Sequence, residues 1–333
     1  MKNFLPRWLF PVVKLLVAGA VMFWLFKSGK LNWGLILEGT LAPMVIAIGV
    51  LCNITLVSSS AVRWYLLLKG QGVSLPLHFA HNLTYITVFF NNFIPGGIGG
   101  DALRIAFVLK RSGSHRGKTV LTIIMDRFLG LYSMLLIAGT SSILYFDQVK
   151  ASPPLLLLAY STLSLVGAAP PITIFVLWLM RRTHHLPDWI KGNTGSQLNK
   201  IFLLVEQFAH YFHSRKKYVF AAILISLMGQ CIAVGSFLWI AFNLSIHFPE
   251  HNFFLATPWS WIANILPVSP GGLGVGEAAF DQICQWLMPD QIAASFGTVF
   301  LINRLFTILA TLPGLMMFFL RDRFLPDPHP AQP

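Results

Sequence analysis

The sequence is poor in charged residues and in cysteine. Only 11% of its 333 residues are charged and 55% are hydrophobic, too few polar groups for the surface of a soluble protein. The three cysteines, Cys52, Cys231 and Cys284, lie in or beside apolar stretches, and their spacing fits neither a disulfide framework nor a metal site. We therefore expect a membrane protein without a metal ion or cofactor.

The chain also lacks any Gly/Ser-rich linker or polar low-complexity segment. We expect one integral membrane domain over residues 1–324 and a short Pro-rich cytoplasmic tail over 325–333. A transmembrane helix needs about 20 mainly apolar residues, and helices are favoured because open sheets leave backbone groups unsatisfied in lipid. The stretches that reach this length are 9–28, 35–62, 119–146, 154–180, 217–246 and 291–320. The expected fold is an all-α polytopic membrane protein with about six transmembrane helices.

Acidic residues are scarce relative to basic ones. The chain has 24 Lys and Arg against 12 Asp and Glu, a formal net charge of +12. If the N-terminus is cytoplasmic and each stretch crosses once, most basic residues fall on the cytoplasmic side, whereas Lys27, Lys30 and Lys150 fall outside. This distribution follows the positive-inside rule, so the charge indicates topology and affinity for anionic lipid headgroups. We expect a multi-pass protein of the cell inner (cytoplasmic) membrane, with both termini cytoplasmic and no nucleic-acid partner.

The polar connection from Arg181 to Lys217 is expected to differ from the spanning helices. Its apolar residues recur at helical spacing and face away from Lys200 and Glu206. This pattern predicts an amphipathic helix lying on the cytoplasmic surface.

Two further apolar regions, 77–109 and 253–288, are interrupted by proline and clustered glycine. Residues 91–101 read Asn-Asn-Phe-Ile-Pro-Gly-Gly-Ile-Gly-Gly-Asp, and residues 270–277 read Pro-Gly-Gly-Leu-Gly-Val-Gly-Glu. Both present Pro-Gly-Gly, an aliphatic residue and further glycine followed by an acid. We expect each region to form a re-entrant broken hairpin instead of one spanning helix.

The match between these regions extends downstream. Arg127 follows Asp101, and Arg304 follows Glu277, at nearly the same distance along the chain. The chain is therefore expected to contain two repeat units, about 35–146 and 217–320. Three crossings separate the hairpins, so the repeats should be inverted, the arrangement of many alternating-access transporters.

Charged residues at membrane depth cost a few kcal/mol each and are often functional. A glycine cluster that opens a helix offers free backbone N–H groups and a positive dipole end, which suit phosphate. On this interpretation the arginines neutralise a phospholipid phosphate, and the acids meet an amine or relay protons. The candidate substrate-binding residues are Gly96, Gly97, Gly99, Gly100, Asp101, Arg104, Asp126, Arg127, Gly271, Gly272, Gly274, Gly276, Glu277 and Arg304.

A structural alternative stays open for the same residues. Asp101–Arg127 and Glu277–Arg304 could be ion pairs that fasten each hairpin to a neighbouring helix, with the glycines only permitting close packing. Arg63, followed by Trp64 and Tyr65, is interpreted as a snorkelling residue in an aromatic belt at the end of the second helix.

Three segments together resemble a known family. Residues 91–104, the run Asp126-Arg127-Phe128-Leu129-Gly130, and residues 270–277 are similar to the lysylphosphatidylglycerol synthase transmembrane-region, or flippase-like, family, over nearly the whole chain. In two-domain synthases this region is held to flip the aminoacylated lipid to the outer leaflet. The sequence ends shortly after Arg323, so the resemblance implies a stand-alone member without the soluble aminoacyl-transferase domain.

The first hypothesis is a lipid flippase that moves a phospholipid or lipid-linked headgroup from the inner to the outer leaflet, without catalytic residues. The alternative is a membrane-embedded enzyme or accessory subunit acting on a polyprenyl, hopanoid or glycolipid substrate. The expected partner is a membrane lipid. A lipid-modifying synthase or glycosyltransferase and a second copy of the chain stay open as further partners.

Overall fold

The computed structural model describes residues 16, 19–20, 22–32, 34–37, 43–94, 99–111, 116–182, 211, 214–246, 248–289, 295–320 and 324–325. These residues contain α-helices and no β-strand. Five described helices are long and apolar enough to cross a membrane, with candidate spans at Pro43–Gly70, Gly117–Leu144, Pro153–Ile172, Lys216–Asn243 and Phe296–Phe319. The all-α polytopic fold is therefore confirmed.

Some expected elements lie wholly or partly outside the described residues. They are the first span at 9–28, the amphipathic helix between 181 and 217, and the Pro-rich tail. These remain predictions, as does the boundary of the single domain.

The helix expected at 35–62 is displaced toward the C-terminus and forms α3, Pro43–Gly70. Leu66, Leu67 and Leu68 continue the apolar run beyond Arg63. The helix ends before Gly72, whose φ of 72° is a left-handed conformation that favours glycine. Arg63 consequently lies within the helix and not at its end.

Both interrupted regions form broken hairpins. The first consists of α4, Leu77–Phe93, and α5, Gly99–Arg111; the second consists of α12, Glu250–Asn264, and α13, Val275–Leu287. No arm is among the helices that are long and apolar enough to count as candidate spans. Each region is broken at its glycines and prolines, as predicted.

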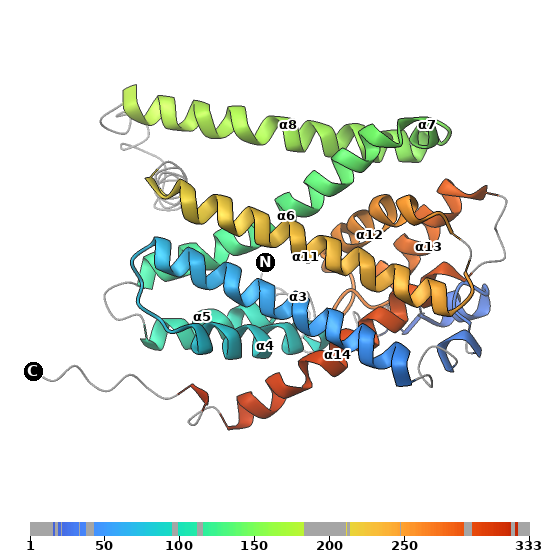
Figure 1. The fold of residues 1–333 in the computed structure, drawn as a ribbon, viewed down its shortest axis with the longest axis horizontal. Helices are drawn as coiled ribbons and strands as arrows, with labels where there is room; N and C mark the ends of the chain where they lie inside the picture. The colour runs from blue at the N-terminus through green and yellow to red at the C-terminus, as the bar shows by residue number, and fades with distance from the viewer. Residues whose placement is uncertain are drawn as a thin grey trace, which may run out of the picture.

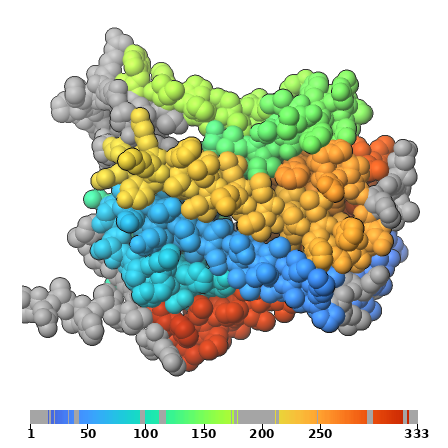
Figure 2. Space-filling model, in the orientation of Figure 1, coloured from blue at the N-terminus to red at the C-terminus, as the bar shows by residue number. Residues whose placement is uncertain are grey.

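The remaining helices are α6, Arg116–Leu144, α7, Phe146–Val149, α8, Pro153–Arg182, α11, Lys216–Asn243, and α14, Phe296–Phe319. Helices α3 and α11 pack side by side and run in opposite directions through the centre (Figure 1). In the space-filling view they form two adjacent bands, blue and gold, along the length of the molecule (Figure 2). Helix α8 lies at the edge of the bundle and contacts α6 (Figure 1).

Each hairpin packs against the other half of the chain. Helix α4 contacts α14, and α12 contacts α6, while each hairpin also contacts the spanning helices of its own half. The contacts among eight helices have the same pattern in both halves of the chain. Each contact in one half has a counterpart in the other when the helices are paired as α3 with α11, α4 with α12, α5 with α13 and α6 with α14. The hairpins enter from opposite ends of the bundle (Figure 1), so the repeat is inverted.

The buried core also divides between the two halves. The larger cluster joins α11 to α14 and includes Phe237 and Phe280, whose ring centroids lie 5.1 Å apart. A second cluster, which includes Trp64 and Phe79, joins α3 to α4 and α5. Each hairpin is thus anchored by apolar packing, and its glycine-rich tip is brought to the middle of the bundle.

Candidate functional site

The first hairpin turns back at the glycine pair that begins α5. The main-chain N–H of Gly100 donates to Oδ1 of Asn91 at 2.9 Å, and a β-carbon at Gly100 would overlap the carbonyl group of Thr87 on α4. Glycine therefore allows the two arms to touch and places Asp101 in the first turn of α5. Gly96 and Gly97 lie outside the described residues.

Asp126 of α6 joins two arginines from different helices. Its Oδ2 accepts a hydrogen bond from Nη1 of Arg104 on α5 at 3.1 Å, and its Oδ1 accepts one from Nε of Arg63 on α3 at 2.7 Å. Arg63 Nη1 also donates to Oγ of Ser226 on α11 at 3.0 Å. One carboxylate thus links α3, α5 and α6, and Arg63 extends the link to α11.

Arg104 is only 2% exposed and incompletely hydrogen-bonded. Its guanidinium carbon lies 3.6 Å from the ring centroid of Trp64, a cation–π contact. The indole N–H of Trp64 donates to Thr122 Oγ1 at 3.1 Å and so fixes the ring. Nε and Nη2 of Arg104 are buried and form no hydrogen bond within the described part of the chain. Two donors of this side chain therefore remain for an added acceptor.

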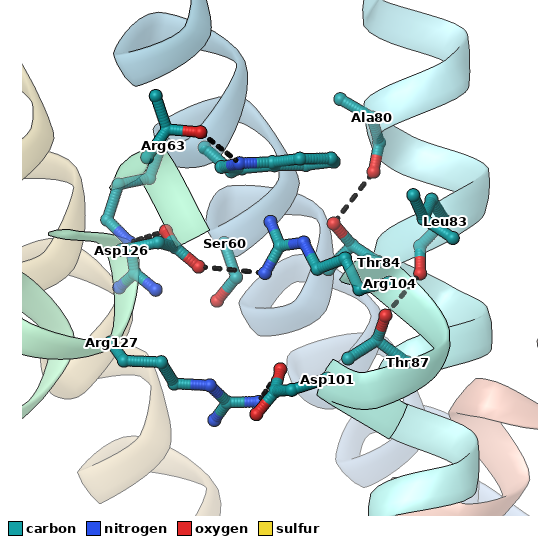
Figure 3. Close-up of polar contacts among 12 residues, drawn as sticks. Ser60, Arg63, Ala80, Leu83, Thr84, Thr87, Asp101, Arg104, Asp126 and Arg127 are labelled. Atoms are coloured by element: carbon teal, nitrogen blue, oxygen red, sulfur yellow. Dashed lines mark hydrogen bonds and ion pairs between the residues drawn. The ribbon is translucent and has the colours of Figure 1, made fainter. Parts of the chain in front are cut away.

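Arg127 and Asp101 form the outer part of the same cluster. Nη2 of Arg127 donates to Oδ1 of Asp101 at 2.6 Å, and the Arg127 side chain is 51% exposed. In Figure 3 this pair lies beside Arg104 and Asp126, near Ser60 of α3. We call Arg63, Asp101, Arg104, Asp126 and Arg127 the arginine cluster. Its three arginines and two aspartates leave a formal surplus of one positive charge.

The second hairpin holds a different arrangement around Arg304 of α14. Nε and Nη2 of Arg304 donate to the two carboxylate oxygens of Glu277, at 2.6 and 3.2 Å. Its Nη1 donates to the carbonyl oxygen of Gly271 at 2.6 Å, and Nη2 also donates to Asn264 Oδ1 at 2.8 Å and to the Gly272 carbonyl at 3.2 Å. All three guanidinium nitrogens are engaged, so Arg304 fastens the tip of the hairpin.

The glycines of this second tip are explained by backbone geometry. Gly271, Gly272 and Gly274 have φ values of 57°, 71° and 83°, which side chains other than hydrogen rarely allow. A β-carbon at Gly276 would overlap the ring of Phe300. The N–H of Gly274 donates to Oε2 of Glu277 at 2.8 Å. Turn formation and close packing account for these four candidate residues.

The two halves carry related polar networks with different charge. In the second half, Asn303 of α14 accepts hydrogen bonds through Oδ1 from Ser236 of α11 at 2.8 Å and from Asn53 of α3 at 3.3 Å. Asp126 of α6, Arg63 of α3 and Ser226 of α11 form the corresponding junction in the first half. The junction at Asn303 is neutral, whereas the junction at Asp126 is charged. Among the described residues, only the junction at Asp126 adjoins an arginine, Arg104, with buried nitrogens that form no hydrogen bond.

Both ion pairs that the structural alternative predicted are formed, Asp101–Arg127 and Glu277–Arg304. Sequence reasoning treated Arg104, Arg127 and Arg304 alike, but the structure separates Arg304 from the arginine cluster. The interpretation of Arg63 as a snorkelling residue is wrong, because α3 continues past it and its side chain binds Asp126. The apolar triplet that follows Tyr65 was the signal that the helix continues.

Lys30 also forms a buried contact that the sequence did not predict. The sequence placed Lys30 on the outer side of the membrane. In the structure its Nζ lies 3.0 Å from Oδ2 of Asp281 on α13, and the Asp281 side chain is fully buried. Asp281 also accepts a hydrogen bond from Gln285 at 2.7 Å. The pair attaches residues 22–32 to the second hairpin and leaves no surplus charge there.

The arginine cluster is chemically suited to bind an anion. Guanidinium groups donate in a planar fork that fits two oxygens of a phosphate or carboxylate, and arginine keeps its charge in proteins. Within the described ranges no three His, Cys, Asp or Glu side chains come together as a metal site. The geometry of the cluster is therefore compatible with an anion such as a phosphate or a carboxylate.

Comparisons with known proteins agree with this architecture. The sequence profile described as lysylphosphatidylglycerol synthase TM region matches residues 12–314. UPF0104 membrane protein PH1989 of Pyrococcus horikoshii is 26% identical over 236 residues, which cover 65% of this chain and 69% of that protein. No solved structure matches the chain. Because the profile covers most of the chain, including both glycine-rich hairpins, the protein belongs to the lysylphosphatidylglycerol synthase transmembrane-region family of multi-pass membrane proteins.

Proposed function

We propose that this protein is a flippase that moves a lipid with a phosphate-bearing headgroup from the inner to the outer leaflet. The observation that supports it best is the arginine cluster, in which Arg104 is buried with two hydrogen-bond donors available. The family relationship supports a role connected with membrane lipids, and the headgroup specificity and direction are our inference.

A purely structural role accounts poorly for the cluster. A charge at the centre of a membrane helix costs about 2.5–3.5 kcal/mol on insertion scales, and a buried donor without a partner costs about 1–3 kcal/mol more. Arg304 offsets such costs with contacts from all three nitrogens, whereas Arg104 does not. A phosphate would satisfy the donors of Arg104 and compensate the surplus positive charge.

The exposure of Arg127 provides a route to the site. Its side chain is half exposed, whereas that of Arg104 is buried, so a headgroup could meet Arg127 first and Arg104 second. Exchange of Asp101 for a lipid phosphate as the partner of Arg127 would loosen the contact between α5 and α6. The inverted repeats would then rock about the central helices α3 and α11 and deliver the headgroup to the other leaflet.

The decisive experiment is lipid movement in liposomes that contain the purified full-length protein. Fluorescent lipids with zwitterionic, anionic, aminoacylated and polyprenyl-linked headgroups are offered, and the fraction accessible to an external quencher is followed over time. Arg104→Met should abolish protein-dependent movement while the protein stays folded, because Asp126 retains Arg63. Lys150→Met, which removes one charge from an exposed residue far from the cluster, should move lipid at the wild-type rate.

The proposal fails if no lipid in the panel moves faster than in protein-free liposomes, or if Arg104→Met moves lipid as fast as wild type. Mass spectra of the recovered lipids distinguish movement from chemical conversion. A new lipid species that depends on the protein would instead support the membrane-enzyme alternative.

A further inference from the structure

A second basic site lies where three spanning helices end. A pocket of about 380 Å³ opens between the C-terminal end of α3, the first turns of α6 and the start of α11. Its described lining residues are Gly70, Gln71, Lys118, Leu121, Tyr211, Ser214 and Arg215. The candidate spans end or begin at Gly70, Gly117 and Lys216, which places the pocket at the depth of the lipid headgroups.

The floor of the pocket is a fixed part of the fold. Tyr211 is buried, and its hydroxyl donates to the carbonyl oxygen of Leu67 on α3 at 3.1 Å. Gly70 makes room for this ring, because a β-carbon there would overlap the Tyr211 hydroxyl. The carbonyl of Tyr211 accepts a hydrogen bond from the N–H of Arg215 at 2.9 Å. The Tyr211 ring therefore packs against the end of α3 and forms a fixed part of the pocket lining.

The charged residues of the described pocket lining are all basic. Lys118 and Arg215 are exposed, and no carboxylate is among its described lining residues. Burial raises the pKa of Tyr211, so its hydroxyl stays neutral and adds no negative charge. The N-terminal end of α11, where Arg215 is the N-cap residue, adds to the positive potential through the helix dipole.

We propose that this pocket binds the phosphate group of an anionic phospholipid from the leaflet at the basic end of the bundle. Lys118 and Arg215 would each contact the phosphate from one side, and Gln71 would donate from the rim. The occupied pocket would hold a lipid where α3, α6 and α11 meet. It is separate from the arginine cluster, since Lys118 and Asp126 are about 12 Å apart along α6 at ~1.5 Å per residue.

The test measures binding to the full-length protein in a neutral detergent. The probes are short-chain phosphatidylglycerol, short-chain phosphatidylcholine and inorganic phosphate, and bound lipid is counted by native mass spectrometry at rising concentration. Lys118→Gln with Arg215→Gln removes both cations of the pocket. The matched control is Lys69→Gln with Lys217→Gln, which removes two exposed charges from the same end without touching the described lining.

We expect phosphatidylglycerol to bind more tightly than phosphatidylcholine, and the pocket variant to lose affinity about fivefold for each cation removed. The control should lose less. Gln71→Trp, which fills the pocket without changing the charge, should also weaken phosphatidylglycerol binding. Competition by inorganic phosphate would identify the phosphate group itself as the ligand, and its absence would show that the lipid glycerol or chains are also needed.

The proposal is overturned if both lipids bind alike, or if the pocket and control variants lose the same affinity, since either outcome indicates a diffuse basic surface. In the Arg104→Met background, the pocket substitutions should cause the same loss of affinity as in the wild-type background. A failure here therefore leaves the proposed flippase function untouched, and a failure of lipid movement leaves this site untouched.

Discussion

The main-chain carbonyl of Asn92 lies against the α-carbon of Gly271, so the tips of the two hairpins touch in the middle of the bundle. A β-carbon at Gly271 would overlap that carbonyl. The hairpins come from opposite ends of the molecule (Figure 1) and meet at this contact. Any movement of one repeat against the other must change this contact.

Gly271→Ala should therefore destabilise the protein more than an alanine at a comparable glycine. Gly72 is the matched control, because its φ is also positive but no atom lies within 4 Å of its would-be β-carbon. We expect Gly72→Ala to cost about 1–2 kcal/mol for the left-handed backbone. Gly271→Ala adds about 1–3 kcal/mol of steric overlap. Thermal unfolding in detergent measures both, and equal shifts in Tm would contradict the contact between the tips.

Arg304→Gln should be far more damaging to stability than Arg127→Gln. Loss of Arg304 leaves Glu277, which is 0% exposed, without its cation, and breaking a buried pair costs about 3–5 kcal/mol. Arg127 is half exposed, so loss of its pair with Asp101 should cost at most about 1 kcal/mol. Yield and Tm of the purified variants provide the measurement. If Arg127→Gln proves the less stable, the assignment of Arg304 to structure and Arg127 to function is reversed.

Asp126 and Arg104 should show strong energetic coupling. Asp126→Asn leaves Arg63 and Arg104 without a carboxylate between them and should cost about 3–5 kcal/mol. Arg104→Met in the same chain removes one of the two cations, so the double variant should be more stable than the sum of the single effects predicts. A double-mutant cycle on unfolding free energy should give a coupling of about 1–3 kcal/mol. Additive effects would show that Arg104 and Asp126 do not interact.

Lys30→Met should release the segment at residues 22–32 from the second hairpin. Asp281 is fully buried and loses its cationic partner, while the remaining attachment consists of neutral contacts such as Asn32 N–H to Thr298 Oγ1 at 3.0 Å. Hydrogen exchange of residues 22–32 should therefore accelerate relative to wild type. Lys150→Met, which removes an exposed pair with Asp147, serves as the control. Unchanged exchange in Lys30→Met would show that apolar packing alone holds the segment.

Composition and local chemistry made the general architecture predictable. Long apolar runs require helices in lipid, and prolines and glycines inside two of them required breaks, so the hairpins at 77–109 and 253–288 were predicted and are confirmed. The matched acid and arginine positions allowed the ion pairs Asp101–Arg127 and Glu277–Arg304 as a structural alternative to substrate binding, and both pairs are formed. The hairpin breaks depend on residues that are adjacent in the sequence, and the acid–arginine positions depend on the internal repeat. Both patterns are visible in a single sequence.

The end of α3 and the role of Arg63 were not predictable in the same way. An arginine beside Trp64 and Tyr65 fits an interface as well as it fits a buried site, because the sequence does not reveal whether a carboxylate lies opposite. Only the packing of α6 against α3 supplies Asp126 to Arg63, and only the packing of α5 against α6 brings Arg104 to the same carboxylate.

The sequence by itself determined that the chain is a bundle of lipid-exposed helices with two broken, charge-bearing hairpins, because hydrophobicity and backbone geometry are local properties. Only the tertiary structure showed that Arg104 and Arg304 differ in their hydrogen-bond partners. It gave Arg304 carbonyl, carboxylate and amide oxygen partners for all its nitrogens. It left two nitrogens of Arg104 without a partner among the described residues, because a hydrogen bond depends on where distant segments meet. That difference divides the repeated motif into a structural half and a candidate binding half.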